Sequence, residues 1–196
     1  MTWTSKVVIV TGGGGGIGRA VAHRFAKAGA AVVVVNRTAS KAEQVAAEIR
    51  EAGFQATAMA ADVSSEADVQ RVVRETLTQY GRIDVMVNNA AVCPQIRLTD
   101  LSLTQWNQVI TNNLTSVFLC CREVIPSMVR NGGGVIVNVS SVHALATLEG
   151  YSAYAASKGG IVALTRAIAL DYAKQNIRVN TVLPGAVQTP MLESSV

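Results

Sequence analysis

The chain has 196 residues, the size of one domain, and we expect residues 1–196 to fold as a single unit. With 49% hydrophobic and 15% charged residues, its composition excludes a disordered chain, a collagen and a charged coiled coil. The formal net charge of +4, from 17 lysines and arginines against 13 aspartates and glutamates, favours an anionic ligand without requiring a nucleic acid.

Neither the apolar runs nor the cysteines indicate a membrane or metal protein. The runs are far shorter than the ~20 residues of a membrane-spanning helix, and the first residues lack the apolar region of a secretory signal. Cys93, Cys120 and Cys121 have neither metal-site nor disulfide-framework spacing. We therefore expect a cytoplasmic protein with no metal site and no membrane or nucleic-acid partner.

Short β-branched segments alternate with longer alanine-rich segments, the pattern of βαβ units in a parallel sheet. The predicted strands are almost continuously apolar, as expected when helices cover both faces of a sheet: 6–10, 31–35, 55–60, 83–88, 135–139 and 178–183. The predicted helices are 17–28, 40–52, 66–80, 103–130 and 152–174. These elements predict a doubly wound parallel α/β sheet, a three-layer α/β/α Rossmann fold.

A glycine-rich segment connects the first predicted strand to the first helix. Glycines here allow a tight turn and let backbone N–H groups approach a pyrophosphate at the positive end of the helix that Ile17 opens. We expect Gly12, Gly16, Ile17 and Gly18 to contact the cofactor. The alternative is a flexible loop whose glycines only satisfy turn geometry, but the strand-loop-helix context favours nucleotide binding.

The second predicted strand ends in Asn36-Arg37, where an NAD-specific dinucleotide fold usually has an acid for the ribose 2′-hydroxyl. The guanidinium of Arg37 is suited to a 2′-phosphate instead, and Lys41 is a possible second cation. We therefore expect NADP rather than NAD. Alternatively, Arg37 is an ordinary solvated charge.

Tyr154 and Lys158 lie four residues apart in a predicted helix, so their side chains share one face. An adjacent ammonium lowers the pKa of a phenol from its reference value of ~10, which prepares the phenol for proton transfer to or from a carbonyl oxygen. This spacing also occurs by chance on many helices. Support comes from Ser140 and Ser141, which follow a strand at the sheet edge where ligands bind.

Together these motifs resemble the short-chain dehydrogenase/reductase family, in the branch that carries Thr-Gly-x-x-x-Gly-x-Gly and Tyr-x-x-x-Lys. The resemblance extends almost from end to end of the chain. Beyond the two motifs it rests on Asp62-Val63, Asn88-Asn89-Ala90, Asn113-Leu114, Ser141, Ile177 to Asn180, Pro184-Gly185 and Thr189.

The resemblance implies a role for each matching residue. Tyr154 would exchange a proton with the substrate oxygen, which Ser141, rather than Ser140, would hold. Lys158 would lower the tyrosine pKa and bind the nicotinamide ribose, and Asn113 would hold a water that connects the lysine to solvent. The other residues implied at the cofactor are Asp62 and Val63 at the adenine, Asn88, which would steady the central sheet near the cofactor, Thr189 at the carboxamide, and Pro184 and Gly185.

Two features depart from the family pattern. Ala91 stands where the family has glycine, and the chain ends at Val196, whereas relatives continue through a substrate-covering segment and a further strand. We therefore expect a domain truncated at its C-terminus, without the last strand and the substrate lid. The resemblance also implies a homo-oligomer, a dimer or tetramer, through the helices 103–130 and 152–174; without the last strand a dimer is favoured.

Some polar residues are interpreted as structural. His143 is expected to be solvated or locally hydrogen-bonded and is left outside the site. Cys120 and Cys121 lie in the apolar part of a long predicted helix and are expected to pack in the core. Cys93 follows the Asn88 segment and is expected near the site.

These residues favour an oxidoreductase that transfers a hydride between NADP(H) and a ketone or 3-oxoacyl group, or the corresponding secondary alcohol. One alternative is a cofactor-binding protein without turnover, because the substrate lid is missing. Another is an epimerase or dehydratase that retains the tyrosine and lysine. The identity of the substrate and the direction of the reaction stay open.

Overall fold

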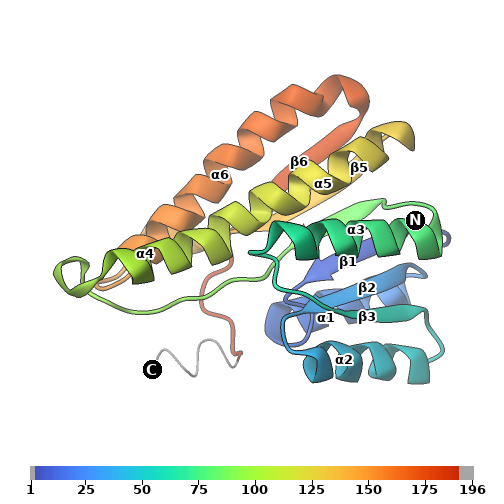
Figure 1. Ribbon diagram of the computed structural model, residues 1–196, viewed down its shortest axis with the longest axis horizontal. Helices are drawn as coiled ribbons and strands as arrows, with labels where there is room; N and C mark the ends of the chain where they lie inside the picture. The colour runs from blue at the N-terminus through green and yellow to red at the C-terminus, as the bar shows by residue number, and fades with distance from the viewer. Residues whose placement is uncertain (1–2, 190–196) are drawn as a thin grey trace.

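The computed structural model describes residues 3–189 and contains one six-stranded parallel sheet in the order β3-β2-β1-β4-β5-β6 (Figure 1). The strands are β1 (Val7–Thr11), β2 (Ala31–Asn36), β3 (Ala56–Ala60), β4 (Val85–Asn88), β5 (Gly134–Val139) and β6 (Ile177–Val182). The helices are α1 (Gly16–Lys27), α2 (Ala39–Glu51), α3 (Glu66–Tyr80), α4 (Leu103–Ile110), α5 (Ser116–Arg130) and α6 (Ser152–Tyr172). The predicted doubly wound α/β fold is confirmed, and all six predicted strands are present with small shifts at their ends.

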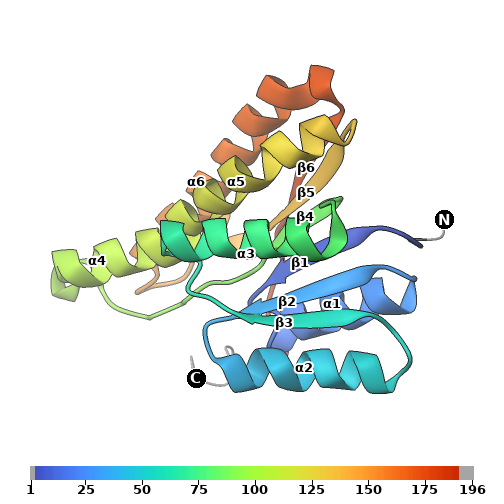
Figure 2. The same cartoon turned by 45° about the vertical axis from the view of Figure 1, so that its right-hand side comes forward.

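Helices cover the two faces of the sheet in separate layers (Figures 1 and 2). On one face, Ile9, Val33 and Met86 pack with the apolar side chains of α3, α5 and α6. On the other face, Val8 and Val34 pack with α1 and α2. This alternation within β1 and β2 buries both faces, which is why these strands are apolar at every position except the last.

The strand order reverses between β1 and β4, where chain segments leave the sheet toward opposite sides. In open parallel sheets, the loops at the carboxyl ends of such strands leave a crevice for ligands. The loops after β1 and β4 therefore define the expected position of a site.

The predicted single helix 103–130 is interrupted. Between α4 and α5 the chain forms one π-helical turn, η2 (Thr111–Thr115). The wider turn is supported by side chains: Asn112 donates to the Gln108 carbonyl, and the Ser116 hydroxyl donates to the Asn112 carbonyl. Because π-turns in α-helices frequently accompany functional sites, the position of Asn113 inside this turn indicates a functional residue.

The expectation that helices cover both faces of every strand is wrong for β6. Ile177 and Val179 are buried, whereas Arg178, Asn180 and Val182 are exposed. The cause is that α1 and α2 contact mainly β1, β2 and β3, and no other helix within residues 3–189 covers that face of β6. No strand beyond β6 occurs in this range, and residues 190–196 lie outside the described part.

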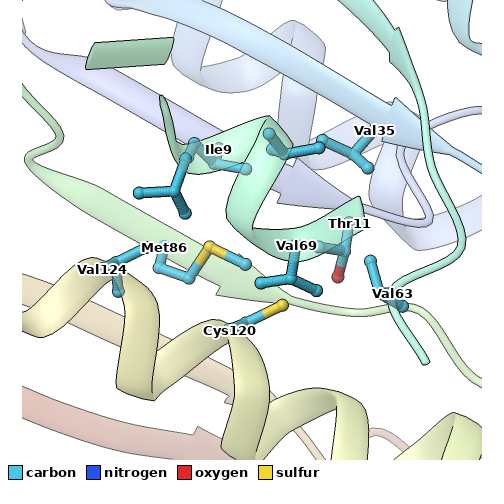
Figure 3. Close-up of a pocket in the computed structure, with 10 residues that line it drawn as sticks. Ile9, Thr11, Val35, Val63, Val69, Met86, Cys120 and Val124 are labelled. Atoms are coloured by element: carbon cyan, nitrogen blue, oxygen red, sulfur yellow. The ribbon is translucent and has the colours of Figure 1, made fainter. Parts of the chain in front are cut away.

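Cys120 and Cys121 are buried in the core, as predicted, and are 3% and 1% exposed. Figure 3 shows the Cys120 thiol pointing toward Val69, in the space between α5, α3 and the sheet that Met86 and Val124 also line. The cavity there is about 10 Å³ and lined almost entirely by apolar groups, so it is a packing defect rather than a ligand site. No helix among the described residues has the length and apolar character needed to cross a membrane.

Candidate active site

The loop between β1 and α1 requires its glycines. Gly12 and Gly16 have φ values of 62° and 51°, which side chains other than glycine rarely adopt. A Cβ atom on Gly18 would lie 2.3 Å from the Gly12 carbonyl oxygen. At the start of α1, Gly15 provides no side-chain cap, so the first N–H groups of the helix face the loop without a side-chain acceptor. This geometry fits a phosphate group.

Asn89 holds this loop, a contact that the sequence reasoning missed. Its Nδ2 donates to the Thr11 and Gly12 carbonyl oxygens at 3.0 and 3.3 Å. The Thr11 hydroxyl in turn accepts from the backbone N–H groups of Asn89 and Ala90. The position of Asn89 directly after β4, across from the glycine loop, was the available signal. Through Asn89, the end of β4 fixes the shape of the glycine loop.

Asn88 lies beneath the site and does not line it. It is 3% exposed, and its Nδ2 donates to the Asn138 Oδ1 at 2.8 Å, which bridges the ends of β4 and β5. The Asn138 Nδ2 in turn donates to the Thr165 hydroxyl of α6. The geometry agrees with the structural role that the family resemblance implies for Asn88.

A hollow of about 230 Å³ opens beside the glycine loop at the ends of β2, β3 and β4. Four of the predicted cofactor contacts line it: Gly12, Arg37, Asp62 and Val63. The other lining residues are Val35, Asn36, Thr38, Lys41, Ala61, Ala90, Ala91, Val92 and Asn112. Arg37 and Lys41 are exposed, and neither forms an ion pair with any residue between 3 and 189. The glycine cradle, the adjoining hollow and the two free cations fit a phosphorylated dinucleotide.

Tyr154 and Lys158 lie on one face of α6, as predicted, at the carboxyl end of β5. The Lys158 Nζ is 5.5 Å from the centre of the Tyr154 ring and donates to the Val139 carbonyl at 2.9 Å. Ser141 lies beside Tyr154 and lowers the pKa of its phenol, whereas the Ser140 hydroxyl donates to the Lys158 carbonyl at 2.8 Å. Ser141, and not Ser140, therefore shares the site with Tyr154.

The pKa of Tyr154 is shifted in the direction opposite to the expected one. Burial raises the pKa of Tyr154 to about 12, and the neighbouring Ser141 opposes this only in part. Burial also lowers the pKa of Lys158 to about 8. The prediction that the lysine sets a lowered tyrosine pKa is therefore wrong for this arrangement, because the removal of the phenol from water is the largest influence on its pKa.

Asn113 links the cofactor side of the site to α6. It is fully buried, and its Oδ1 accepts from the Val92 N–H at 2.8 Å. Its Nδ2 donates to the Val92 carbonyl and to the Ser157 hydroxyl at 2.9 and 3.1 Å. The π-turn thus places an amide that braces the segment after β4 against the helix that carries Tyr154.

The remaining predicted contacts follow β6. Thr189 lies against Gly16, where a Cβ atom added to the glycine would be 3.2 Å from the Thr189 Cγ2. The Pro184 carbonyl accepts from the Val142 N–H at 3.0 Å and ties this segment to the one that follows Ser141. Gly185 is exposed. Thr189 thus lies at the glycine loop and Pro184 at the segment beside the tyrosine.

Two side chains near Tyr154 complete the site. Cys93 lies close enough to Tyr154 and Lys158 for both to affect the pKa of its thiol, which confirms the expectation that this cysteine lies near the site. Burial raises the pKa of the Cys93 thiol, so it is uncharged at neutral pH. His143 is locally hydrogen-bonded, as predicted, through its Nδ1 to the Thr147 hydroxyl at 2.8 Å. Its ring centre also lies 5.5 Å from that of Tyr154, a contact that the sequence did not indicate.

Comparisons with known proteins agree with this geometry. A match to the short chain dehydrogenase family covers residues 6–196. The chain belongs to the short-chain dehydrogenase/reductase family. Members of this family are NAD(P)-dependent oxidoreductases, and this chain is therefore one of them. Its named relatives are an oxidoreductase and a dehydrogenase.

Three similar proteins illustrate the family. An uncharacterized oxidoreductase of Thermotoga maritima is 40% identical over 184 residues, which are 94% of this chain and 72% of the relative. A 3beta-hydroxysteroid dehydrogenase of Mediterraneibacter gnavus is 42% identical over 97% of this chain and 69% of the relative. The solved structure of a 7 alpha-hydroxysteroid dehydrogenase with NADH and 7-oxo glycochenodeoxycholic acid is 35% identical, with a TM-score of 0.96 over all of this chain and 76% of the other.

Proposed function

We propose that the protein interconverts a ketone or 3-oxoacyl group and the corresponding secondary alcohol with NADP(H). The observation that carries the proposal is the position of Ser141, Tyr154 and Lys158 together at the end of β5. The segment from Asn89 to Cys93 connects them to the glycine loop, because Asn89 donates hydrogen bonds to that loop and Cys93 lies beside Tyr154. A proton-transfer group and a dinucleotide site thus share one edge of the sheet.

Ser141, Tyr154 and Lys158 have separate roles in the proposed reaction. The Ser141 hydroxyl donates a hydrogen bond to the carbonyl oxygen, and the Tyr154 hydroxyl transfers its proton to that oxygen as negative charge develops there. A tyrosine pKa of about 12 keeps this phenol protonated at neutral pH, which suits the reductive direction. Lys158, largely charged at neutral pH, stabilises the phenolate that remains. The bound nicotinamide supplies or accepts the hydride.

The preference for NADP rests on charge at the hollow. Arg37 and Lys41 are exposed there, Asn36 stands at the end of β2, and the carboxylate that would bind an unphosphorylated ribose is absent from that position. A neighbouring solved structure contains NADH, so the family accommodates both cofactors. The positive charges of Arg37 and Lys41 at the hollow favour the phosphorylated cofactor, NADP.

The substrate class is supported by the named relatives. One is a 3beta-hydroxysteroid dehydrogenase, and a solved neighbour holds a 7-oxo bile acid. Both names describe a ketone or secondary alcohol on a carbon skeleton. This chemistry matches a site with one proton-transfer group and one hydroxyl donor.

One experiment separates turnover from binding alone. The purified chain is mixed with NADPH and binding is recorded by cofactor fluorescence; a panel of small ketones, oxosteroids and acetoacetyl thioesters is then added. We expect NADPH oxidation with at least one compound, and Tyr154→Phe should bind NADPH normally while losing most of the activity. Binding without oxidation across the panel favours a cofactor-binding protein without turnover.

The cofactor preference has its own test. Arg37→Asp removes a cation from the hollow and adds a charge that repels a 2′-phosphate. We expect kcat/KM to fall at least about tenfold with NADPH and to change little or rise with NADH. An unchanged ratio of the two kcat/KM values contradicts the assignment.

A further inference from the structure

His143 is part of an aromatic cluster around the reacting tyrosine. It lies in the short 3-10 turn η3 (Val142–Ala144), and its ring centre is 5.5 Å from that of Tyr154, in an edge-on arrangement of 76°. It is also 4.8 Å from the ring centre of Tyr151, which in turn lies 6.3 Å from Tyr154. Each ring therefore contacts the other two, and Tyr154 is held by two aromatic neighbours.

The imidazole is itself fixed. Its Nδ1 is 2.8 Å from the Thr147 hydroxyl, which donates its own proton to the Leu148 carbonyl. The His143 backbone N–H donates to the Ser141 hydroxyl oxygen at 3.2 Å. One residue thus touches both side chains that would bind the substrate oxygen.

The segment that carries His143 is tied at both ends. At its start, the Val142 N–H donates to the Pro184 carbonyl. At its end, the Gly150 carbonyl accepts from the Ile96 N–H at 2.7 Å, and Glu149 pairs with Arg97 at 2.6 Å. These contacts join three loops that are far apart in sequence. The position of the His143 ring is therefore set by the fold rather than by an independent mobile loop.

We propose that His143 is a positioning residue of the reaction centre: its ring holds the Tyr154 phenol in place and shields it from water, and its N–H orients the Ser141 hydroxyl. The N–H occupies a lone pair of Ser141 and leaves its proton free for the substrate oxygen. The inference deepens the proposed function and rests on it. Because a misplacement of ~1 Å can cost ~100-fold in rate, a ring that only packs can still control turnover.

The environment of Tyr154 defines a readout that needs no turnover. The groups facing its phenol are the Cys93 thiol, the Ser141 hydroxyl, the Tyr151 phenol and, near the ring, the Lys158 ammonium. Burial is the main reason that its pKa is raised. Removal of the His143 ring exposes the phenol and should return its pKa toward the ordinary value, whereas a phenylalanine in its place keeps the shielding.

The test compares His143→Ala with His143→Phe. The control is His23→Ala, because His23 is the only other histidine of the sequence and its side chain bonds to Glu48, which connects α1 to α2. The four tyrosines are replaced by 3,5-difluorotyrosine, whose phenol ionises at a pH where the chain stays folded, and Tyr154→Phe identifies the fluorine NMR signal of Tyr154. We expect the Tyr154 titration to move to lower pH in His143→Ala only. An unmoved titration in His143→Ala overturns the proposal.

Kinetics provide the second readout. With a substrate found for the wild type, His143→Ala should lower kcat about tenfold without changing the KM for the cofactor, and His143→Phe should restore it to within about threefold. If His143→Phe is as impaired as His143→Ala, ring packing is not the role and the proposal fails. If the wild type turns over no compound while the titration moves as expected, the proposed function fails and the positioning of Tyr154 stands.

Discussion

Lys158 and Tyr154 show how strongly burial controls single residues in this protein. Lys158 is 2% exposed, yet its ammonium has one hydrogen-bond acceptor among the described residues, the Val139 carbonyl. A charged group held in this way is poorly compensated for its lost hydration. The amino group is therefore kept at a cost in stability, as expected of a side chain retained for function.

This cost predicts a pH dependence of stability. The pKa of Lys158 is lowered from 10.5 to about 8, so above about pH 8 the unfolded chain binds more protons at this residue than the folded chain. The unfolding free energy of the wild type relative to Lys158→Met should therefore rise by about 1 kcal/mol from about pH 7 to about pH 9. Urea unfolding at both pH values measures it, and Lys174→Met, at an exposed position, should show no such change.

A pH-independent difference between the wild type and Lys158→Met would contradict the lowered lysine pKa. The buried thiols Cys120 and Cys121 and the phenol of Tyr154 have raised pKa values and act in the opposite direction at high pH. They are present in both proteins, so the comparison cancels their contribution.

The glycine loop and the start of α1 form one element. Its function depends on how closely its backbone approaches the cofactor. In Gly18→Ala the new methyl group meets the Gly12 carbonyl at 2.3 Å, so the loop has to move. We expect at least about tenfold weaker NADPH binding, measured by cofactor fluorescence. Gly159→Ala is the matched control, because its added methyl group meets no atom within 4 Å in α6. Equal affinities of the two variants would show that the loop does not bind the cofactor.

The π-turn is a second element that joins the two halves of the site. Asn113→Ala removes three hydrogen bonds and leaves the Val92 N–H and carbonyl without these partners. The unfolding free energy should fall by about 2–3 kcal/mol, measured by urea denaturation. Asn107→Ala, at an exposed position of α4 with no side-chain hydrogen bond to a described residue, should change it by less than about 0.5 kcal/mol. Similar losses in both variants would contradict the bracing role.

At the scale of the whole molecule, several large apolar side chains are exposed on the outer helices. Leu170 of α6 is 80% exposed, and Phe118 and Val129 of α5 are 43% and 37% exposed. Such side chains on adjacent helices are typical of an interface between subunits. The resemblance to the family implies a homo-oligomer through these same helices.

We expect a dimer at micromolar concentration, measured by light scattering. Combined Phe118→Lys and Leu170→Lys should shift the mass toward the monomer, because charges at a buried interface are costly. Leu145→Lys is the control: Leu145 is 81% exposed but lies in the loop after η3, outside the two helices. A monomeric wild type, or equal masses for all three proteins, would contradict this interface.

Local pattern was sufficient for the elements and for the motifs within them. Short runs of apolar or small residues predicted all six strands, most clearly β1 and β2, whose two faces are both covered by helices. Tyr154 and Lys158 are one helical turn apart, so their shared face followed from spacing alone. Gly12, Gly16 and Gly18 were predictable for a similar reason, because backbone conformation and close approach act within a few residues.

Tertiary structure decided what depends on contacts between distant segments. Asn89 reaches the glycine loop because the sheet order places β1 beside β4, and His143 reaches Tyr154 because the turn η3 packs on α6. The direction of the Tyr154 pKa shift and the exposure of alternate residues in β6 depend on which elements cover these groups. Burial is a sum over neighbours from the whole chain, so the sequence by itself determined which groups are present, and the fold determined how water and charge act on them.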